Sequence, residues 1–246
     1  MNEHPLFQNH RPYTRWWWFY DDIKREDITR QLQWVRDYHF GGVEIAWMYP
    51  QSGASEGPRW LSPEWTDLVR FTKSEADRFG LGCDFTFSTA WPFGGSIVPE
   101  KDAAQVFGGL STQRMEKPWE LSYYGRGYIL NHLDRAAVER YGNIVGTALK
   151  PAMEGSVSGL FSDSWEVFPE GLWSTGLDEV FRERFDYDLE PYKQDLDAYP
   201  DVRYDYRKLV SDVVLDGFFR PYIDVCRNLC GVSRVQCHGA PTDLVA

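Results

Sequence analysis

The sequence comprises 246 residues with a mass of 28.6 kDa, of which 43% are hydrophobic and 26% are charged. This balance is typical of a folded protein with a well-filled core and excludes a largely disordered chain. The length exceeds that of one small sandwich and suits a single (β/α)8 barrel. Aromatic residues make up 16% of the chain, more than a core requires, so we expect some of them to line a binding site.

The formal net charge of −11 comes from 37 acidic and 26 basic residues. Such a chain lacks the basic stripe that binds nucleic acid and is not attracted to anionic membranes. No apolar run approaches the roughly 18–20 residues that a membrane span needs. The N-terminus has no apolar segment behind basic residues, as a secretory signal would have, so we expect a cytoplasmic protein.

Four cysteines are too few for a disulfide framework in a chain of this length. Cys226 and Cys230 lie one turn apart on a predicted helix, and His238 directly follows Cys237. Buried free thiols are a more common reason for this spacing than a metal site. The residues themselves therefore predict no metal site.

Predicted strands and helices alternate along the first half of the chain. In chain order these elements are a strand at 15–20, a helix at 27–38, a strand at 43–47, a helix at 62–79 and a strand at 83–88. Ile28, Leu32 and Val35, at positions i, i+4 and i+7, indicate an amphipathic first helix. Ser62 and Pro63 are typical of the start of the second helix.

The alternation continues after a loop rich in Trp, Pro and Gly. The further elements are a candidate strand near 128–130, a helix at 134–149 capped by Asp134, a strand at 159–165, helices at 177–184 and 206–229, and a strand at 233–238. The long helix contains Gly217 and Pro221, so we expect a break or bend there.

This order predicts an α/β fold with a parallel sheet, of the TIM type. Five strands, or six with the candidate near 128–130, are fewer than the eight of a (β/α)8 barrel. Long helices and loops occupy the rest of the chain. We therefore expect residues 1–246 to form one domain that is an incomplete barrel.

The active site of such a barrel lies at the carboxyl ends of the strands. The tryptophans and polar side chains predicted there are Trp17, Glu44, Trp47, Trp91, Asp163, Glu166 and His238. Tryptophan stacks on the apolar faces of pyranose rings. Carboxylates bind hydroxyl groups and carry out acid–base chemistry on the glycosidic oxygen. The pattern indicates a site that cleaves sugars.

Five long segments, in this order along the chain, carry a resemblance to a known family. They are RPYTRWWWFY, ITRQLQWVRDYHFGGVEIAWMYP, FTFSTAWPFGGSIVPEKDAAQ, FSDSWEV and SRVQCHGAPTDL. Together they resemble glycoside hydrolase family 106, which contains α-L-rhamnosidases with a catalytic (β/α)8 barrel. The resemblance runs from about Arg11 to the last residue.

The resemblance implies that Glu166 is one of two catalytic glutamates of an inverting mechanism. The second belongs to a later segment of the family, and this chain ends at Ala246, so we expect a domain truncated at its C-terminus. Some members hold calcium at the sugar hydroxyls, and carboxylates at this rim are suitable ligands. Family members are often exported, in contrast to the location expected from the N-terminus.

Each candidate also has a structural interpretation. Tryptophans 16–18 alternate between the faces of a strand, so part of the group is expected in the core. Glu44 lies in the middle of a strand, where an inward polar residue is satisfied within the barrel. Asp163 is also suited to orienting loop amides, and His238 to a structural hydrogen bond. Trp91, on a loop, favours a binding surface.

Three functional hypotheses remain at this stage. The first is a glycosidase acting on terminal α-L-rhamnosides, with a rhamnose-containing glycan or glycoside as its partner. The second is a carbohydrate-binding partial barrel without catalysis; turnover by this chain alone would point to another residue, such as Glu170 or one from a partner subunit. The third is an incomplete product whose open sheet edges promote self-association.

Overall fold

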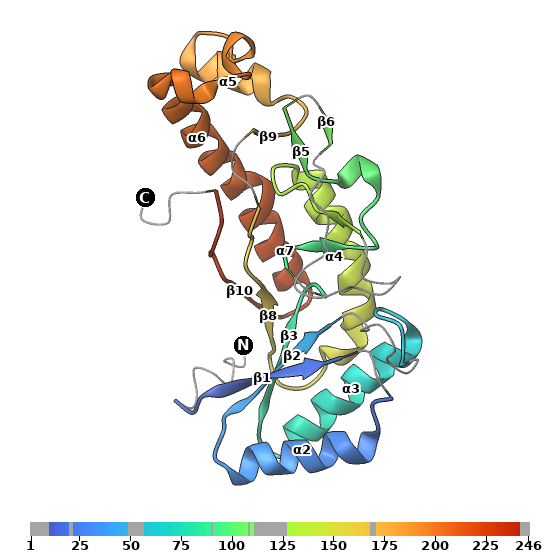
Figure 1. The fold of residues 1–246 in the computed structure, drawn as a ribbon. Coiled ribbons are helices and arrows are strands. Elements are labelled where there is room, and N and C mark those ends of the chain that lie inside the picture. Colours follow the sequence, from blue (N-terminus) through green and yellow to red (C-terminus); the bar gives the residue numbers. More distant parts are fainter. Residues whose placement is uncertain are drawn as a thin grey trace.

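The computed structural model describes residues 10–19, 22–48, 57–89, 91–107, 109–110, 127–167 and 171–241. Their central feature is a five-stranded parallel sheet in the order β1–β2–β3–β8–β10. The strands are β1 (Tyr13–Trp18), β2 (Gly42–Trp47), β3 (Gly82–Thr86), β8 (Gly159–Ser162) and β10 (Val232–Val235). The five predicted βα strands are therefore confirmed (Figure 1).

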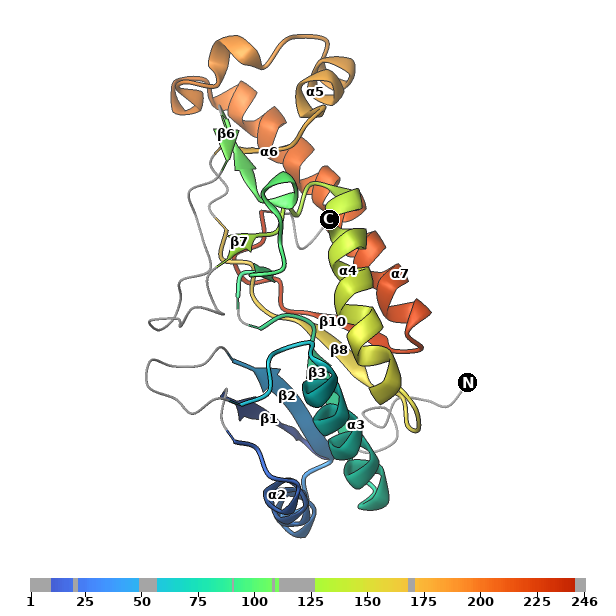
Figure 2. The same cartoon turned by 90° about the vertical axis from the view of Figure 1, so that its right-hand side faces the viewer.

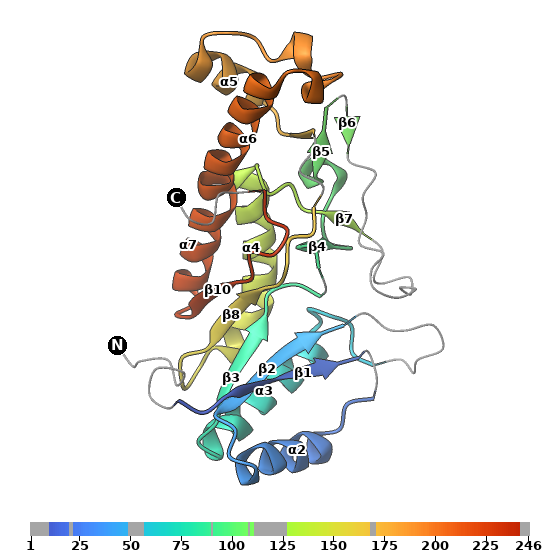
Figure 3. The same ribbon diagram turned by 60° about the vertical axis from the view of Figure 1, so that its left-hand side comes forward.

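Helices cover one face of this sheet. They are α2 (Arg25–Asp37), α3 (Pro63–Arg78), α4 (Arg135–Leu149) and α7 (Arg220–Asn228). Neighbouring helices contact one another in the same order as the strands they follow or precede. Figure 2 shows α3, α4 and α7 on the same side of the strands, and Figure 3 shows β1, β2 and β3 in front of α3. This single helical layer on a parallel sheet is TIM-like.

The predicted helix starts are confirmed by their caps. The Ser62 hydroxyl accepts a hydrogen bond from the Trp65 amide at 3.2 Å, with Pro63 at the first helical position. The Asp134 carboxylate accepts hydrogen bonds from the amides of Ala136 and Ala137. Such caps satisfy amides that have no partner within the helix.

The candidate strand near residues 128–130 is not a sixth βα strand. It contains β7 (Tyr128–Ile129), which pairs antiparallel with β4 (Gly94–Gly95) outside the parallel sheet. Gly94 permits this pairing, because a Cβ there would lie 2.5 Å from the Tyr128 carbonyl oxygen. The strand predicted at 159–165 also ends earlier, at Ser162, because the chain turns into a loop at Asp163.

The predicted bend in the long C-terminal helix is a π-helix. The helix begins six residues earlier than expected, as α6 (Pro200–Val214), and continues through η5 (Leu215–Phe219) into α7. Pro221 has no amide hydrogen to donate, and a π-helical turn accommodates the lost bond. The regular α-helical pattern is thus interrupted near Gly217 and Pro221, but the helix continues through this turn without a break.

A second region lies at the opposite end of the molecule from α2, as Figure 1 shows. It contains the upper part of α6, α5 and a small antiparallel sheet, β6–β5–β9. The strands of this small sheet are β5 (Gln105–Val106), β6 (Gly109–Leu110) and β9 (Leu172–Trp173), and the helices beside it are α5 (Leu177–Phe185), η3 (Glu190–Tyr192) and η4 (Leu196–Ala198). The remaining short helices of the molecule are η1 (Glu100–Asp102) and η2 (Lys150–Ala152). None of the described helices is long and apolar enough to cross a membrane.

Candidate active site

The two faces of β1 and β2 sort the predicted site residues. Successive side chains of a strand point to opposite faces, and in-register neighbours share a face. Trp18 and Trp47 are in register and pack edge to face, and Trp47 packs in turn on Trp65 of α3. Trp47 is therefore buried beneath the helices. The structure does not bring it to the face that carries Glu44.

The opposite face, here called the inner face, carries Arg15, Trp17, Glu44, Asp84 and Arg234. Arg15 is in register with Glu44, and Glu44 with Asp84. This face is polar at its centre, with carboxylates and arginines from strands β1, β2, β3 and β10. Glu44 and Asp84 are neighbours here, as their positions in consecutive strands suggest.

Two arginines hold Glu44. The Arg15 Nε and Nη2 atoms donate to Glu44 Oε1 at 3.0 and 2.8 Å, and Arg234 Nη1 donates to Glu44 Oε2 at 2.9 Å. Arg234 Nη1 also donates to Asp84 Oδ2 at 2.9 Å. Only 5% of Glu44 is exposed. The inward-facing structural interpretation of Glu44 thus accounts for both of its carboxylate oxygens.

Burial and neighbouring charges shift the pKa values of Glu44 and Arg15 in opposite directions. Burial raises the pKa of Glu44 above its ordinary value, although Arg15 and Arg234 lower it. Burial also disfavours the charged form of Arg15, but the carboxylates of Asp163 and Glu44 raise the pKa of Arg15 overall. Arg15 therefore remains a cation, and it compensates the negative charge of the inner face.

Neither arginine was among the predicted site residues. The signal that could have identified them is a charged residue inside a predicted strand. Arg15 precedes Trp17 by two positions and therefore shares its face, and Arg234 is the second residue of the predicted strand SRVQCH. A buried charge in a strand needs a partner of opposite sign.

The loop after β8 carries Asp163 and Glu166. Asp163 Oδ2 accepts a hydrogen bond from Arg15 Nη1 at 2.7 Å, and its Oδ1 accepts one from the Ser164 amide at 2.8 Å. The Ser164 hydroxyl donates to Glu166 Oε1 at 2.9 Å. Glu166 is partly exposed, with a positive φ of 39°. Asp163 does orient a loop amide, as its structural interpretation expects.

The turn after β10 supports this loop from the other side. The Trp165 amide donates to the His238 carbonyl oxygen at 2.9 Å. Gly239 has a φ of 70°, and a Cβ there would lie 2.8 Å from the Glu166 amide nitrogen. Only a glycine permits this approach. The imidazole of His238 belongs to an exposed residue, so it is accessible to solvent next to Glu166.

Trp17 and Trp91 form an aromatic surface beside the arginine. Their ring centroids lie 6.5 Å apart, and the Arg15 guanidinium lies 5.2 Å from the Trp17 ring. Trp17 is 38% exposed and lines a hollow of about 230 Å³ together with Phe19 and the β1–α2 connection. An exposed and a half-buried ring next to charged groups suit a ligand with both apolar faces and hydroxyl groups.

Residues 5–114 match the family model of glycoside hydrolase family 106, described as alpha-L-rhamnosidase. This part of the chain, less than half of its length, is thus similar to that family. The comparison with curated proteins found no match.

The comparison with solved structures found chains of similar fold. A rhamnosidase from Novosphingobium sp. PP1Y has a TM-score of 0.67 and 14% identity, covering 92% of this chain and 46% of that one. A GH20 exo β-N-acetylglucosaminidase from Vibrio harveyi has a TM-score of 0.49 and 11% identity, covering 92% of this chain and 35% of that one. This chain spans less than half the length of either protein.

The described residues do not provide the calcium site that the family 106 resemblance implies. Calcium prefers six to eight oxygen ligands. The carboxylates of the inner face are Glu44, Asp84 and Asp163, and arginines or backbone amides bind their oxygens. Within the described part of the chain, no three acidic, histidine or cysteine side chains are arranged to hold a metal. No step below depends on calcium.

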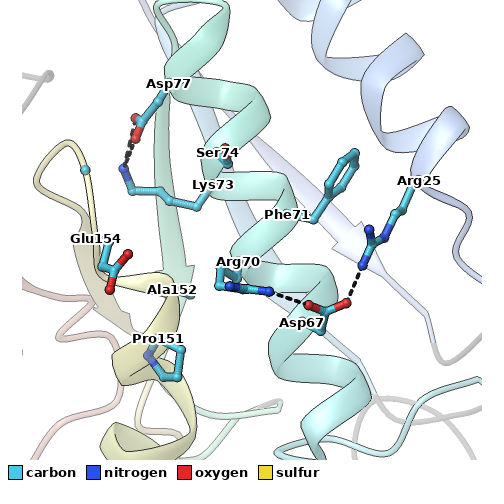
Figure 4. Close-up of a pocket in the computed structure, with 11 residues that line it drawn as sticks. Arg25, Asp67, Arg70, Phe71, Lys73, Ser74, Asp77, Pro151, Ala152 and Glu154 are labelled. Atoms are coloured by element: carbon cyan, nitrogen blue, oxygen red, sulfur yellow. Dashed lines mark hydrogen bonds and ion pairs between the residues drawn. The ribbon is translucent and has the colours of Figure 1, made fainter.

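A larger cavity of about 420 Å³ lies apart from these residues, along α3 and η2. Its lining comes from helices and the loop after η2, as Figure 4 shows, and none of it from a strand. Arg25 and Arg70 both bind Asp67, and Lys73 binds Asp77. Its charged groups thus neutralise one another. Glu170, the alternative carboxylate, lies outside the described residues.

Proposed function

We propose that this protein is a glycoside hydrolase that cleaves terminal α-L-rhamnosides with inversion. The observation that carries the proposal is the position of Glu166. It lies in the loop after β8, four residues past Ser162, at the carboxyl end of the parallel sheet, where TIM-type enzymes have their catalytic groups. The family match of residues 5–114 supports the rhamnoside as substrate.

Glu166 acts as one of the two carboxyl groups of the reaction. In an inverting glycosidase one carboxyl group protonates the departing glycosidic oxygen, while the other takes a proton from water as the water attacks the anomeric carbon. The two groups lie roughly 6.5–9.5 Å apart, which leaves room for that water. The resemblance assigns the second group to a later segment of the family, after the strand that leads to His238.

The neighbouring side chains bind the sugar. Trp17 and Trp91 stack on its apolar face; the exposure of Trp17 and its contact with the half-buried Trp91 support this role. The exposed His238 donates or accepts a hydrogen bond with a hydroxyl group. Glu44 and Asp163, expected from the sequence to contact the sugar, already accept hydrogen bonds from arginines and an amide, so in this proposal they act by fixing Arg15. Trp47 has no such role in the proposal, because it is buried between the sheet and α3.

Replacement of Glu166 tests the proposal. Glu166→Gln keeps the shape of the side chain but removes its acid–base function. We expect turnover of an aryl α-L-rhamnoside to be abolished and the melting temperature to remain nearly unchanged. The matched control is Glu179→Gln, on the exposed face of α5, which should retain full turnover. Undiminished turnover by Glu166→Gln would refute the assignment.

The tryptophan pair also favours a second candidate function, carbohydrate binding without catalysis. Trp17 and Trp91 supply a stacking surface whether or not a second carboxylate is present. Titration calorimetry with rhamnose, beside a turnover assay of the same 246-residue chain, separates the two functions. Binding without turnover favours the binding protein.

The cytoplasmic location stays a prediction, which cell fractionation tests.

A further inference from the structure

A continuous series of hydrogen bonds joins the inner face to Glu166. It starts at Glu44 Oε1, which accepts hydrogen bonds from Arg15. The third donor of the same guanidinium, Nη1, binds Asp163 Oδ2 at 2.7 Å. Asp163 Oδ1 then fixes the Ser164 amide, and the Ser164 hydroxyl binds Glu166 Oε1 at 2.9 Å.

Arg15 reaches far to make these bonds. It starts on β1, at one edge of the sheet, and its contact with Asp163 lies beyond β2 and β3, after the end of β8. Its guanidinium lies 4.8 Å from the ring of Phe161 and 5.2 Å from that of Trp17. Two aromatic rings and two carboxylates thus fix its position.

Arg234 provides a natural comparison. It also binds Glu44, and its guanidinium lies 5.4 Å from the same Phe161 ring. Its second carboxylate, however, is Asp84 rather than Asp163. Both arginines neutralise the inner face, but Arg15 is the one that binds the loop that carries Glu166.

We propose that Arg15 is a positioning residue, which sets the orientation of the Glu166 carboxyl group through Asp163 and Ser164. The inference rests on the proposed catalytic role of Glu166. A catalytic carboxyl group must be held in its productive geometry by residues that are themselves fixed. Lysine cannot replace Arg15 here, because an ammonium group lacks the planar set of donors that spans two carboxylates.

Amide hydrogen exchange tests the link without requiring activity. In Arg15→Lys and Arg15→Met we expect the Ser164 amide to exchange about tenfold faster, relative to the buried Val145 amide of α4. The reference amide corrects for a change in global stability, and Arg15→Lys retains the charge if Arg15→Met fails to fold. The matched control, Arg234→Met, should leave the Ser164 ratio unchanged.

Kinetics then separate positioning from a merely structural role. We expect Arg15→Lys and Ser164→Ala to lower kcat on an aryl rhamnoside about tenfold or more, with KM altered by less than about threefold. Ser74→Ala, at an exposed position of α3 away from this loop, is the control and should keep its kcat. Loss of activity only in proportion to the unfolded fraction would contradict positioning.

The outcomes distinguish the inference from the proposed function. Unchanged Ser164 exchange and unchanged kcat in both Arg15 variants would overturn the inference. If the unaltered chain shows no turnover while Arg15→Lys still accelerates Ser164 exchange, the proposed activity fails and the link from Arg15 to the loop stands.

Discussion

At the scale of single residues, the support beneath Glu166 depends on a buried histidine. His132 is 5% exposed, and its ring centroid lies 4.3 Å from that of Trp165, which is itself 1% exposed. Trp165 directly precedes Glu166 and anchors the loop in the core. Burial lowers the pKa of His132 from 6.5 to about 4, because the interior disfavours the imidazolium ion.

This shift predicts acid sensitivity. The unfolded state binds a proton at His132 more readily than the folded state. The contribution of the neutral, buried His132 to the free energy of unfolding is therefore present above pH 6.5 and is lost as the pH falls toward 4. The expected loss between pH 7 and pH 5 is about 2 kcal/mol in the free energy of unfolding. Urea unfolding of His132→Phe should lack this difference, whereas His39→Asn, at an exposed position, should keep it. An unaltered pH difference in His132→Phe would contradict the account.

At the scale of elements, the junction of α6 and α7 is packed against the start of α4. A Cβ on Gly217 would lie 2.9 Å from the Leu133 carbonyl group and 3.0 Å from the His132 carbonyl oxygen. These neighbours are backbone atoms and therefore yield little. The π-helix η5 thus lets two segments of backbone approach behind Trp165 and Glu166, since Phe218 and Phe219 both contact Trp165.

Gly217→Ala should therefore lower the stability of the protein. We expect a loss of about 1–3 kcal/mol in the free energy of unfolding, measured with urea, because the added methyl group forces the backbones apart. The matched control is Gly146→Ala in α4, where the new Cβ would meet only the Leu229 side chain at 3.3 Å. Alanine is the better helix former, so this control should be neutral or slightly stabilising. Equal effects of the two changes would refute the backbone argument.

At the scale of the whole molecule, the described part of the parallel sheet has two open edges. Among the described residues, β1 pairs with β2 alone and β10 with β8 alone. Unpaired backbone groups at a sheet edge favour pairing with another chain. We therefore predict self-association of this chain, which light scattering measures; a monodisperse monomer would contradict the prediction.

A proline substitution can show which edge of the sheet is involved. The amides of Val232 and Gln236 donate to carbonyl oxygens of β8 and of the residue before it. Because successive amides of a strand point to opposite sides, the Ser233 amide points to the open edge. Ser233→Pro should reduce association and preserve the pairing with β8. Ser233→Ala keeps the amide and should associate as the unaltered chain does. Equal association of both variants would exclude this edge.

Local patterns were sufficient for much of the fold. The spacing of Ile28, Leu32 and Val35 identified the buried side of α2, and all three are in the core. The caps at Ser62 and Asp134 are formed within a few residues of the chain, so they too were predictable. The candidate strand near 128–130 was misassigned because two residues carry no periodicity that reveals a partner, and its partner, β4, lies in a distant loop.

The sequence by itself determined the βα alternation, the family match and the choice of Glu166, because each depends on residue types along a continuous segment. Tertiary structure alone decided that Trp47 lies beneath α3 and that Arg15 joins Glu44 to Asp163. Residues 15 and 163 are 148 positions apart, and only the order and register of the strands bring them together. Local sequence specifies which side chains share a face; packing of distant strands specifies which of them meet.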